Sequence, residues 1–103
     1  MYFSIVYEDK VVGLIYLKHI DNDKRTTDFG IALINDLIKG KGYGSEAIRL
    51  LINYVFVNMN FKKITADTII RNIKSQHVLE KVGFIYTHED LNFKYYKLEN
   101  TAV

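Results

Sequence analysis

The residues best suited to chemistry lie in a basic segment, Lys39–Arg49, which runs into an apolar stretch with helical periodicity. Three glycines occupy alternate positions in it: Gly40, Gly42 and Gly44. Glycine lets the backbone adopt positive φ and approach a ligand closely, and a following helix would present unpaired N–H groups and the positive end of its dipole. Lys39 and Lys41 add charge and Ser45 adds a hydroxyl, so the segment predicts an anion site that suits a pyrophosphate better than a single carboxylate.

Two common phosphate-binding motifs do not describe this segment. The pattern G-x-G-x-x-G would need its last glycine where Ala47 stands, which is an imperfect match even to the alanine-tolerant form. The P-loop places serine or threonine after lysine, whereas Ser45 follows a glycine. A glycine-rich connection with two solvated lysines is the alternative interpretation.

Composition limits the classes of function. A chain of 103 residues, 49% of them apolar, is expected to form one domain with a modest core. The 14 basic and 12 acidic side chains give a net charge of +2, and most basic residues are scattered, so we expect no nucleic-acid partner. The absence of cysteine excludes disulfides, thiolate metal sites and a cysteine nucleophile.

No apolar run approaches the roughly 18 residues that a membrane-spanning helix needs. Met1 leads directly into a strand-like segment and no signal peptide is visible. We therefore expect a soluble, cytoplasmic protein with no membrane partner.

The pattern of apolar, β-branched and turn residues predicts an α/β (α+β) fold in the order βββαβαββ, with two helices and a mixed, mainly antiparallel sheet. The predicted strands are Tyr2–Tyr7, Val11–Ile20, Thr26–Ile34, Lys63–Ile70, Phe84–Thr87 and Phe93–Leu98. A helix over Gly44–Met59 carries apolar residues on a wide face and is expected to be largely buried. A shorter helix over Ile73–Val82 is closed by Gly83, a typical C-terminal cap.

Three segments in order carry a resemblance to a known family. Lys39–Gly44 is similar to the acetyl-CoA signature [QR]-x-x-G-x-[GA] of the GNAT acetyltransferase superfamily, with lysine at the first position. Asn72–Phe84 resembles a second signature, N-x-x-S-x-x-v-x-e-K-x-G-F, of the ribosomal-protein N-terminal acetyltransferase (RimJ/RimL-like) branch. Phe29–Leu33 resembles the strand before the loop in that branch, and the similarity extends from about Tyr2 to Leu98.

The resemblance implies an N-acetyltransferase that moves an acetyl group from acetyl-CoA to a primary amine, either a protein N-terminus or a small amine. It implies that acetyl-CoA contacts the strand end, the glycine loop and the start of the second helix. These cofactor-binding residues are Leu33, Ile34, Lys39, Gly40, Lys41, Gly42, Tyr43, Gly44, Ser45, Asn72 and Ser75. Tyr43 would stack beside the adenine or cover the helix start.

The resemblance also implies catalytic roles. Many members use a tyrosine as the acid that protonates the thiolate, but Leu79 stands at that position and cannot donate a proton. Ser75 matches the serine that replaces it in the similar branch, and Asn72 would hold the pantetheine arm or the sulfur. Helix capping is the alternative role for both. The candidate general bases are Asp28 and Glu89.

The three histidines show no spacing typical of metal ligands, so no metal is expected: His19 falls in a predicted strand, His77 on the second helix and His88 in a turn. GNAT domains usually begin with another strand and two helices, and this chain resembles the part after them. A non-catalytic, truncated domain that binds CoA or a partner chain is therefore the alternative to an enzyme, and a small α/β nucleotide-binding module is a third interpretation. A homodimer that covers the first strands is the expected assembly.

Overall fold

The computed structural model describes residues 1–33 and 43–101 and forms one sheet with two helices packed on it. The elements in chain order are β1 (Tyr2–Tyr7), β2 (Lys10–Asp21), β3 (Thr26–Leu33), α1 (Tyr43–Asn53), the π-helical turn η2 (Tyr54–Asn58), β4 (Lys63–Ile69), α2 (Ile73–Lys81), β5 (Ile85–Glu89) and β6 (Phe93–Glu99). The predicted order βββαβαββ and the mixed sheet are confirmed. Within the described residues, neither helix is long and apolar enough to cross a membrane.

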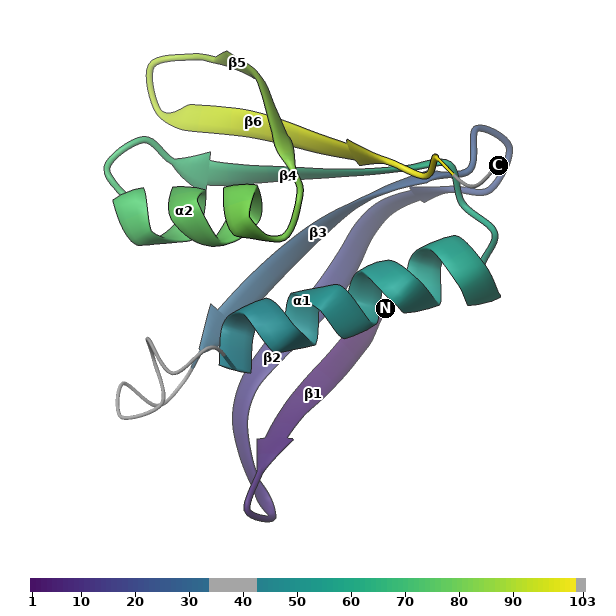
Figure 1. Ribbon diagram of the computed structural model, residues 1–103, viewed down its shortest axis with the longest axis vertical. Coiled ribbons are helices and arrows are strands. Elements are labelled where there is room, and N and C mark those ends of the chain that lie inside the picture. The colour runs from purple at the N-terminus through teal and green to yellow at the C-terminus, as the bar shows by residue number, and fades with distance from the viewer. Residues whose placement is uncertain (34–42, 102–103) are drawn as a thin grey trace.

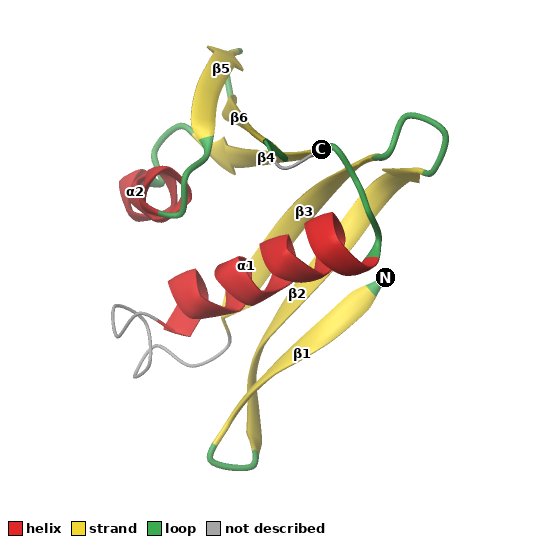
Figure 2. Cartoon of the chain, turned by 45° about the vertical axis from the view of Figure 1, so that its right-hand side comes forward, coloured by secondary structure: helices red, strands yellow, loops and turns green. Residues whose placement is uncertain are grey.

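The six strands lie in the order β1-β2-β3-β4-β6-β5. Only β3 and β4 run parallel, because α1 connects them as a crossover, and the other neighbouring pairs are antiparallel. Figure 1 shows β3 and β4 side by side at one end and spread apart at the other, so the sheet has two arms. In Figure 2, α1 lies along the β1–β3 arm and α2 along the arm of β4, β6 and β5.

The hydrophobic core lies between the sheet and the helices. Alternate residues of the strands face the helices, including Ile15 and Leu17 of β2, Phe29 of β3 and Ile64 and Ala66 of β4. The helical segments contribute the buried residues Ile48, Leu51, Val55 and Leu79. The rings of Phe29 and Phe84 have centroids 5.4 Å apart, so the core connects the first arm to the segment that follows α2.

Two expectations from the sequence are wrong in part. The first helix is not largely buried: Leu50 is 68% and Val57 69% exposed, because only one of its two apolar rows faces the sheet. Its last turn is also π-helical, with the Met59 N–H donating to the Tyr54 carbonyl at 3.1 Å. His88, expected in a turn, lies in β5, because this strand continues two residues further than its apolar pattern indicated.

Helix α2 ends in a Schellman motif that explains the glycine and phenylalanine of the Asn72–Phe84 segment. The Gly83 N–H donates to the Glu80 carbonyl at 3.0 Å, and the Phe84 N–H donates to the Leu79 carbonyl at 2.9 Å. Gly83 has φ of +106°, a conformation that residues with a side chain rarely adopt. Phe84 and Leu79 are both buried. The motif therefore places Phe84 in the core.

We predict that Gly83→Ala lowers the free energy of unfolding by about 1 kcal/mol or more, because a Cβ is strained at this φ. Urea denaturation followed by circular dichroism measures the change. Glu80→Ala, an exposed substitution in the same helix, serves as the control and should stay within about 0.5 kcal/mol of the wild type. Equal stability of the two variants would contradict the capping role.

Candidate functional site

The two arms of the sheet separate just after one residue pair. Parallel pairing of β3 with β4 ends at Phe29 and Ala66. Beyond it, Gly30–Leu33 pairs with β2 and Asp67–Ile69 pairs with β6. Their inner edges have no partner among the described strands, so backbone N–H and C=O groups face the space between the arms. Such edges suit an extended ligand that carries amide groups of its own.

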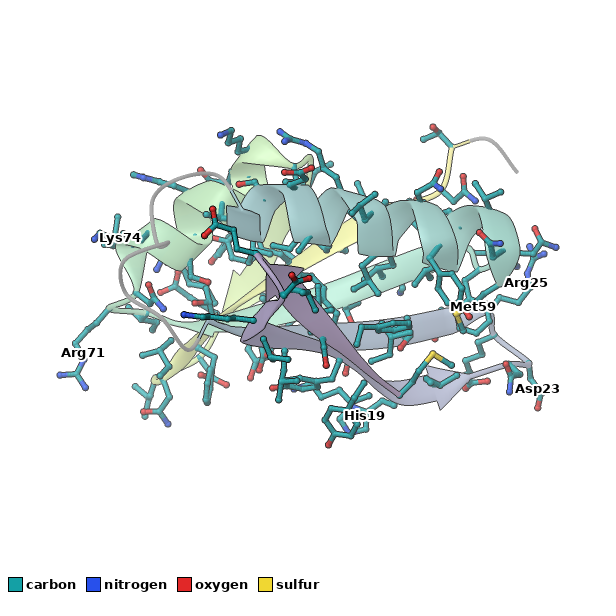
Figure 3. The ribbon with its side chains drawn as sticks, turned by 90° about the horizontal axis from the view of Figure 1, so that it is seen from below. His19, Asp23, Arg25, Met59, Arg71 and Lys74 are labelled. Carbon is teal, nitrogen blue, oxygen red and sulfur yellow. The ribbon has the colours of Figure 1, made fainter. Side chains whose placement is uncertain are left out.

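The open end of this space carries two helix N-termini, with Glu46 in the first turn of α1. Helix α1 follows β3 and helix α2 follows β4, and both strands end at the open end of the space. The N-termini of α1 and α2 therefore both lie there (Figure 1). Helix dipoles therefore favour an anion there. The turn before α2 adds Arg71 and the first turn of α2 adds Lys74, both exposed, and Figure 3 shows both side chains extending outward at this end. Neither cation was assigned a role from the sequence, although both lie within two residues of Asn72.

Asn72 and Ser75 lie together at the start of α2. The Ser75 backbone N–H donates to Asn72 Oδ1 at 3.1 Å, so Asn72 is the N-cap residue of the helix. Ser75 is half-buried in the first turn. Asn72 therefore has the capping role that was its alternative interpretation. Ser75 takes part in this bond through its backbone N–H and not through its hydroxyl.

Buried polar contacts hold the start of α2 in place. Gln76 is only 5% exposed, and its Nε2 donates to the Ile70 carbonyl at 2.7 Å. Lys94 Nζ lies 3.5 Å from Gln76 Oε1, which ties the helix to β6. The orientation of Ser75 thus depends on a glutamine that the sequence did not single out.

Gly30 lies on the first arm directly after the divergence. It pairs in register with Tyr16 of β2, and a Cβ at Gly30 would collide with the Tyr16 ring. The ring can therefore pack over this part of β3 only because residue 30 is glycine.

The sheet face opposite the helices carries a polar depression next to the point of divergence. Its lining comes from β2 to β6 and comprises Lys18, His19, Asp28, Lys63, Thr65, Ala66, Asp67, Thr87, His88, Tyr95, Tyr96 and Lys97. Asp28, a candidate base, lies here and pairs in register with Thr65, one step before the last parallel pair. Its Oδ2 is 2.7 Å from His19 Nδ1.

The lysines and carboxylates at this depression nearly balance. Lys18, Lys63 and Lys97 oppose Asp28 and Asp67 in the lining, and Lys97 Nζ also pairs with Glu99 Oε1 at 2.9 Å. Lys18 Nζ is 3.6 Å from Asp67 Oδ1. The depression is therefore not an acidic site for a polycation.

The far side of the depression is aromatic. His88 stacks on Tyr95 with centroids 4.4 Å apart and planes 9° from parallel. The Tyr95 hydroxyl donates to Asp90 Oδ2 at 2.7 Å. This bond lowers the pKa of Asp90 and raises the pKa of Tyr95 above its ordinary value. Tyr95 is therefore neutral near pH 7, and its hydroxyl is held by the Asp90 carboxylate.

Glu89, the second candidate base, does not line the depression with Asp28. It lies in β5, where its Oε1 accepts a hydrogen bond from the Tyr86 hydroxyl at 3.0 Å. The same bond raises the pKa of Tyr86. The structure thus separates the two candidate bases.

The remaining predicted cofactor residues divide into two sets. Leu33 ends β3, Tyr43 and Gly44 begin α1, and Ser45 is buried at 4% exposure. Ile34, Lys39, Gly40, Lys41 and Gly42 lie outside the described residues. Among the residues that are described, no group of three or more histidines and carboxylates is placed to hold a metal ion.

A comparison with known families identifies this arrangement. The acetyltransferase (GNAT) domain family matches residues 1–85, which is most of the chain. The chain belongs to the GNAT acetyltransferase family. The resemblance inferred from Lys39–Gly44 and Asn72–Phe84 is thereby confirmed at the level of the family.

Individual GNAT relatives agree with this placement. The chain is 34% identical to the probable N-acetyltransferase YjcK of Bacillus subtilis (strain 168) over 77 residues, which are 75% of this chain and 42% of that protein. It is 28% identical to the putative ribosomal N-acetyltransferase YdaF of the same strain, over 80% of this chain and 44% of that protein. The chain thus spans a little less than half the length of these relatives.

A solved GNAT structure shares the fold. The F149A mutant of spermidine N-acetyltransferase SpeG from Vibrio cholerae matches with a TM-score of 0.85 at 25% identity. The match covers 95% of this chain and 64% of that one. The divergence of the two arms therefore belongs to a GNAT-like architecture.

Proposed function

We propose that this protein transfers an acetyl group from acetyl-CoA to a primary amine, as a member of the RimJ/RimL-like branch. The observation that carries the proposal is the pair of unpaired strand edges, Gly30–Leu33 and Asp67–Ile69, with a helix start at the end of each arm. CoA has an extended arm with two amides, which can hydrogen-bond to the strand edges. Its other end is anionic and suits the helix N-termini.

In this proposal each part of the site has one task. The pyrophosphate lies at the glycine loop and the start of α1, and Arg71 and Lys74 add charge-assisted contacts to phosphate. The pantetheine arm runs between the strand edges toward the pair Phe29–Ala66, and Asn72 orients it. Ser75 protonates the leaving thiolate.

The acceptor amine approaches from the polar depression on the opposite face. The lysines and carboxylates there nearly balance, so the lining offers no acidic surface that would favour a polycation over an amine with a single positive charge. A protein N-terminus or a small monoamine fits this balance better than spermidine, on which the neighbouring SpeG acts. We further propose that transfer takes place in the cytoplasm, where acetyl-CoA is available.

A second function has the same support, because the match spans less than half the length of the curated relatives. A domain that binds CoA or a partner chain without turnover would have the same strand edges and helix N-termini. The two functions separate experimentally, because both predict binding of CoA and only the first predicts acetyl transfer.

We predict that acetyl-CoA binds the wild type in isothermal titration calorimetry and that Gly42→Val abolishes binding. A β-branched side chain restricts φ and blocks the close approach of the ligand. Lys74→Gln should weaken binding by about tenfold, or about 1.4 kcal/mol. Lys62→Gln, an exposed cation before β4, is the control that should bind as the wild type does. Unchanged affinity in Gly42→Val would exclude the glycine loop as the phosphate site.

We predict that Ser75→Ala lowers kcat roughly 100- to 10,000-fold, because a positioned proton donor is lost. Since Asn72 accepts from the Ser75 backbone N–H, the substitution leaves the cap intact, and the melting temperature should hardly change. Ser75→Thr retains a hydroxyl and should keep much more of the activity. An equal loss of stability and rate in Ser75→Ala would instead assign the residue a structural role.

We predict a two-fold dimer in which the β1 strands of two copies pair. The sheet order leaves β1 at an edge, and its six residues contain no charge or proline to prevent pairing. Beside it lies an apolar groove lined by Phe3, Ile5, Leu50 and Tyr54, among others.

Sedimentation velocity over a wide concentration range tests this assembly. Val6→Lys, at a position 60% exposed on β1, should give a monomer. Val11→Lys is the matched control, because Val11 pairs with Val6 from the β2 side, is similarly exposed and lies away from the free edge. A wild type that stays monomeric at every concentration would contradict the prediction.

A further inference from the structure

His19 has an unusual backbone conformation for a residue within a strand. The register of β2 with β3 shifts between Lys18 and Asp21, which marks a bulge. Within it, His19 has φ of +52°, in the left-handed region that residues other than glycine seldom adopt. Bulges of this kind redirect a side chain, and strained residues gather at functional sites.

The redirected ring meets a carboxylate. His19 Nδ1 lies 2.7 Å from Asp28 Oδ2. An ionised carboxylate only accepts hydrogen bonds, so Nδ1 carries the proton and the neutral ring keeps its lone pair on Nε2. The His19 side chain is 76% exposed, so a base on this ring is within reach of an incoming molecule.

The pair lies where the two arms of the sheet meet. Asp28 pairs in register with Thr65, and the next pair, Phe29 with Ala66, is the last before the divergence. Figure 3 shows His19 extending from the sheet on the face opposite the helices. In the proposed function, the pantetheine arm runs toward the point where the two arms of the sheet diverge. His19 and Asp28 lie beside that point, on the face from which the acceptor amine approaches.

We propose that His19 is the general base of the reaction and that Asp28 is the residue that positions it. This proposal rests on the proposed acetyl transfer, and it replaces direct catalysis by Asp28 or Glu89. The geometry that carries it is the hydrogen-bonded pair at the bulge, with the exposed His19 side chain in the lining of the depression.

His19 Nε2 takes one proton from the acceptor ammonium, and the freed amine nitrogen forms a C–N bond to the thioester carbonyl carbon. The C–S bond then breaks, and the CoA thiolate takes up a proton from Ser75. The nitrogen loses its second proton, which returns to Ser75 directly or through water. The products are one amide, one thiol and one proton, which His19 passes to solvent.

Other titratable groups face His19 from the neighbouring strands. These are Lys18 on β2, Asp28 on β3, Lys63 and Asp67 on β4, His88 on β5, and Tyr95 and Lys97 on β6. The pH dependence of the rate therefore belongs to this cluster and is read as a difference between variants.

The first test compares His19→Gln with the wild type in a thiol-release assay, using acetyl-CoA and a panel of N-terminal peptides, monoamines and spermidine. We expect kcat to fall roughly 100- to 10,000-fold, with an acetyl-CoA Kd within about twofold of the wild type. We expect the wild type to lose rate toward low pH and His19→Gln to lack this loss. His77→Gln, an exposed histidine on α2, is the matched control and should leave rate and pH profile unchanged.

The second test uses His19→Gly, because glycine adopts this φ readily and the variant should fold at least as well as the wild type. The exposed site leaves room for added imidazole, which should restore a large part of the lost rate. Imidazole should do nothing for Asp28→Asn. Asp28→Asn should lose rate although His19 is present. The amide N–H₂ of the introduced asparagine can donate to His19 Nδ1, which favours the tautomer with the proton on Nε2.

Two outcomes would overturn the assignment alone. One is wild-type turnover and pH profile in His19→Gln. The other is a ¹⁵N NMR spectrum showing the His19 ring protonated on Nε2 in the neutral state, a measurement that needs no turnover. Binding of acetyl-CoA without transfer to any amine by the wild type would overturn both the base and the proposed enzymatic function.

Discussion

The structure depends on the point at which β3 and β4 stop pairing. Phe29 and Ala66 form the last parallel pair, and the Phe29 ring packs on Phe84 with centroids 5.4 Å apart. Phe84 is held there by the Schellman motif at Gly83, so the end of α2 is tied to β3 next to the point of divergence. A fully paired sheet would gain hydrogen bonds, but it would have no opening between its arms.

The features that weaken the fold locally gather around this opening. Two strand edges lack partners among the described strands, His19 adopts positive φ at a bulge, and Gly30 leaves space for the Tyr16 ring. Each departs from the most stable choice for a strand, and each lies close to Asp28 or Ala66 in the sheet. Such departures are expected where a protein keeps a site at the expense of stability.

The sequence predicted the order of elements and the family, because both depend on local patterns. Strand alternation, the helical periodicity after Gly44 and the Asn72–Phe84 motif each involve residues near one another in the chain. The site was harder to predict because its parts meet only in the sheet. His19 and Asp28 come from different strands, and nothing in the sequence marks the bulge that turns the histidine. Likewise, helical spacing could not tell the buried row of α1 from the exposed one that contains Leu50.

Amide hydrogen–deuterium exchange with and without acetyl-CoA tests the central claim most directly, because it reports on the backbone of both arms at once. If the cofactor arm lies between them, acetyl-CoA should slow exchange in Gly30–Leu33 and in Asp67–Ile69, and leave β1 and β5 unchanged. Acetyl-CoA that binds in calorimetry but leaves exchange in both inner edges unaltered would contradict the account, because the divergence of β3 and β4 would then not be the binding site.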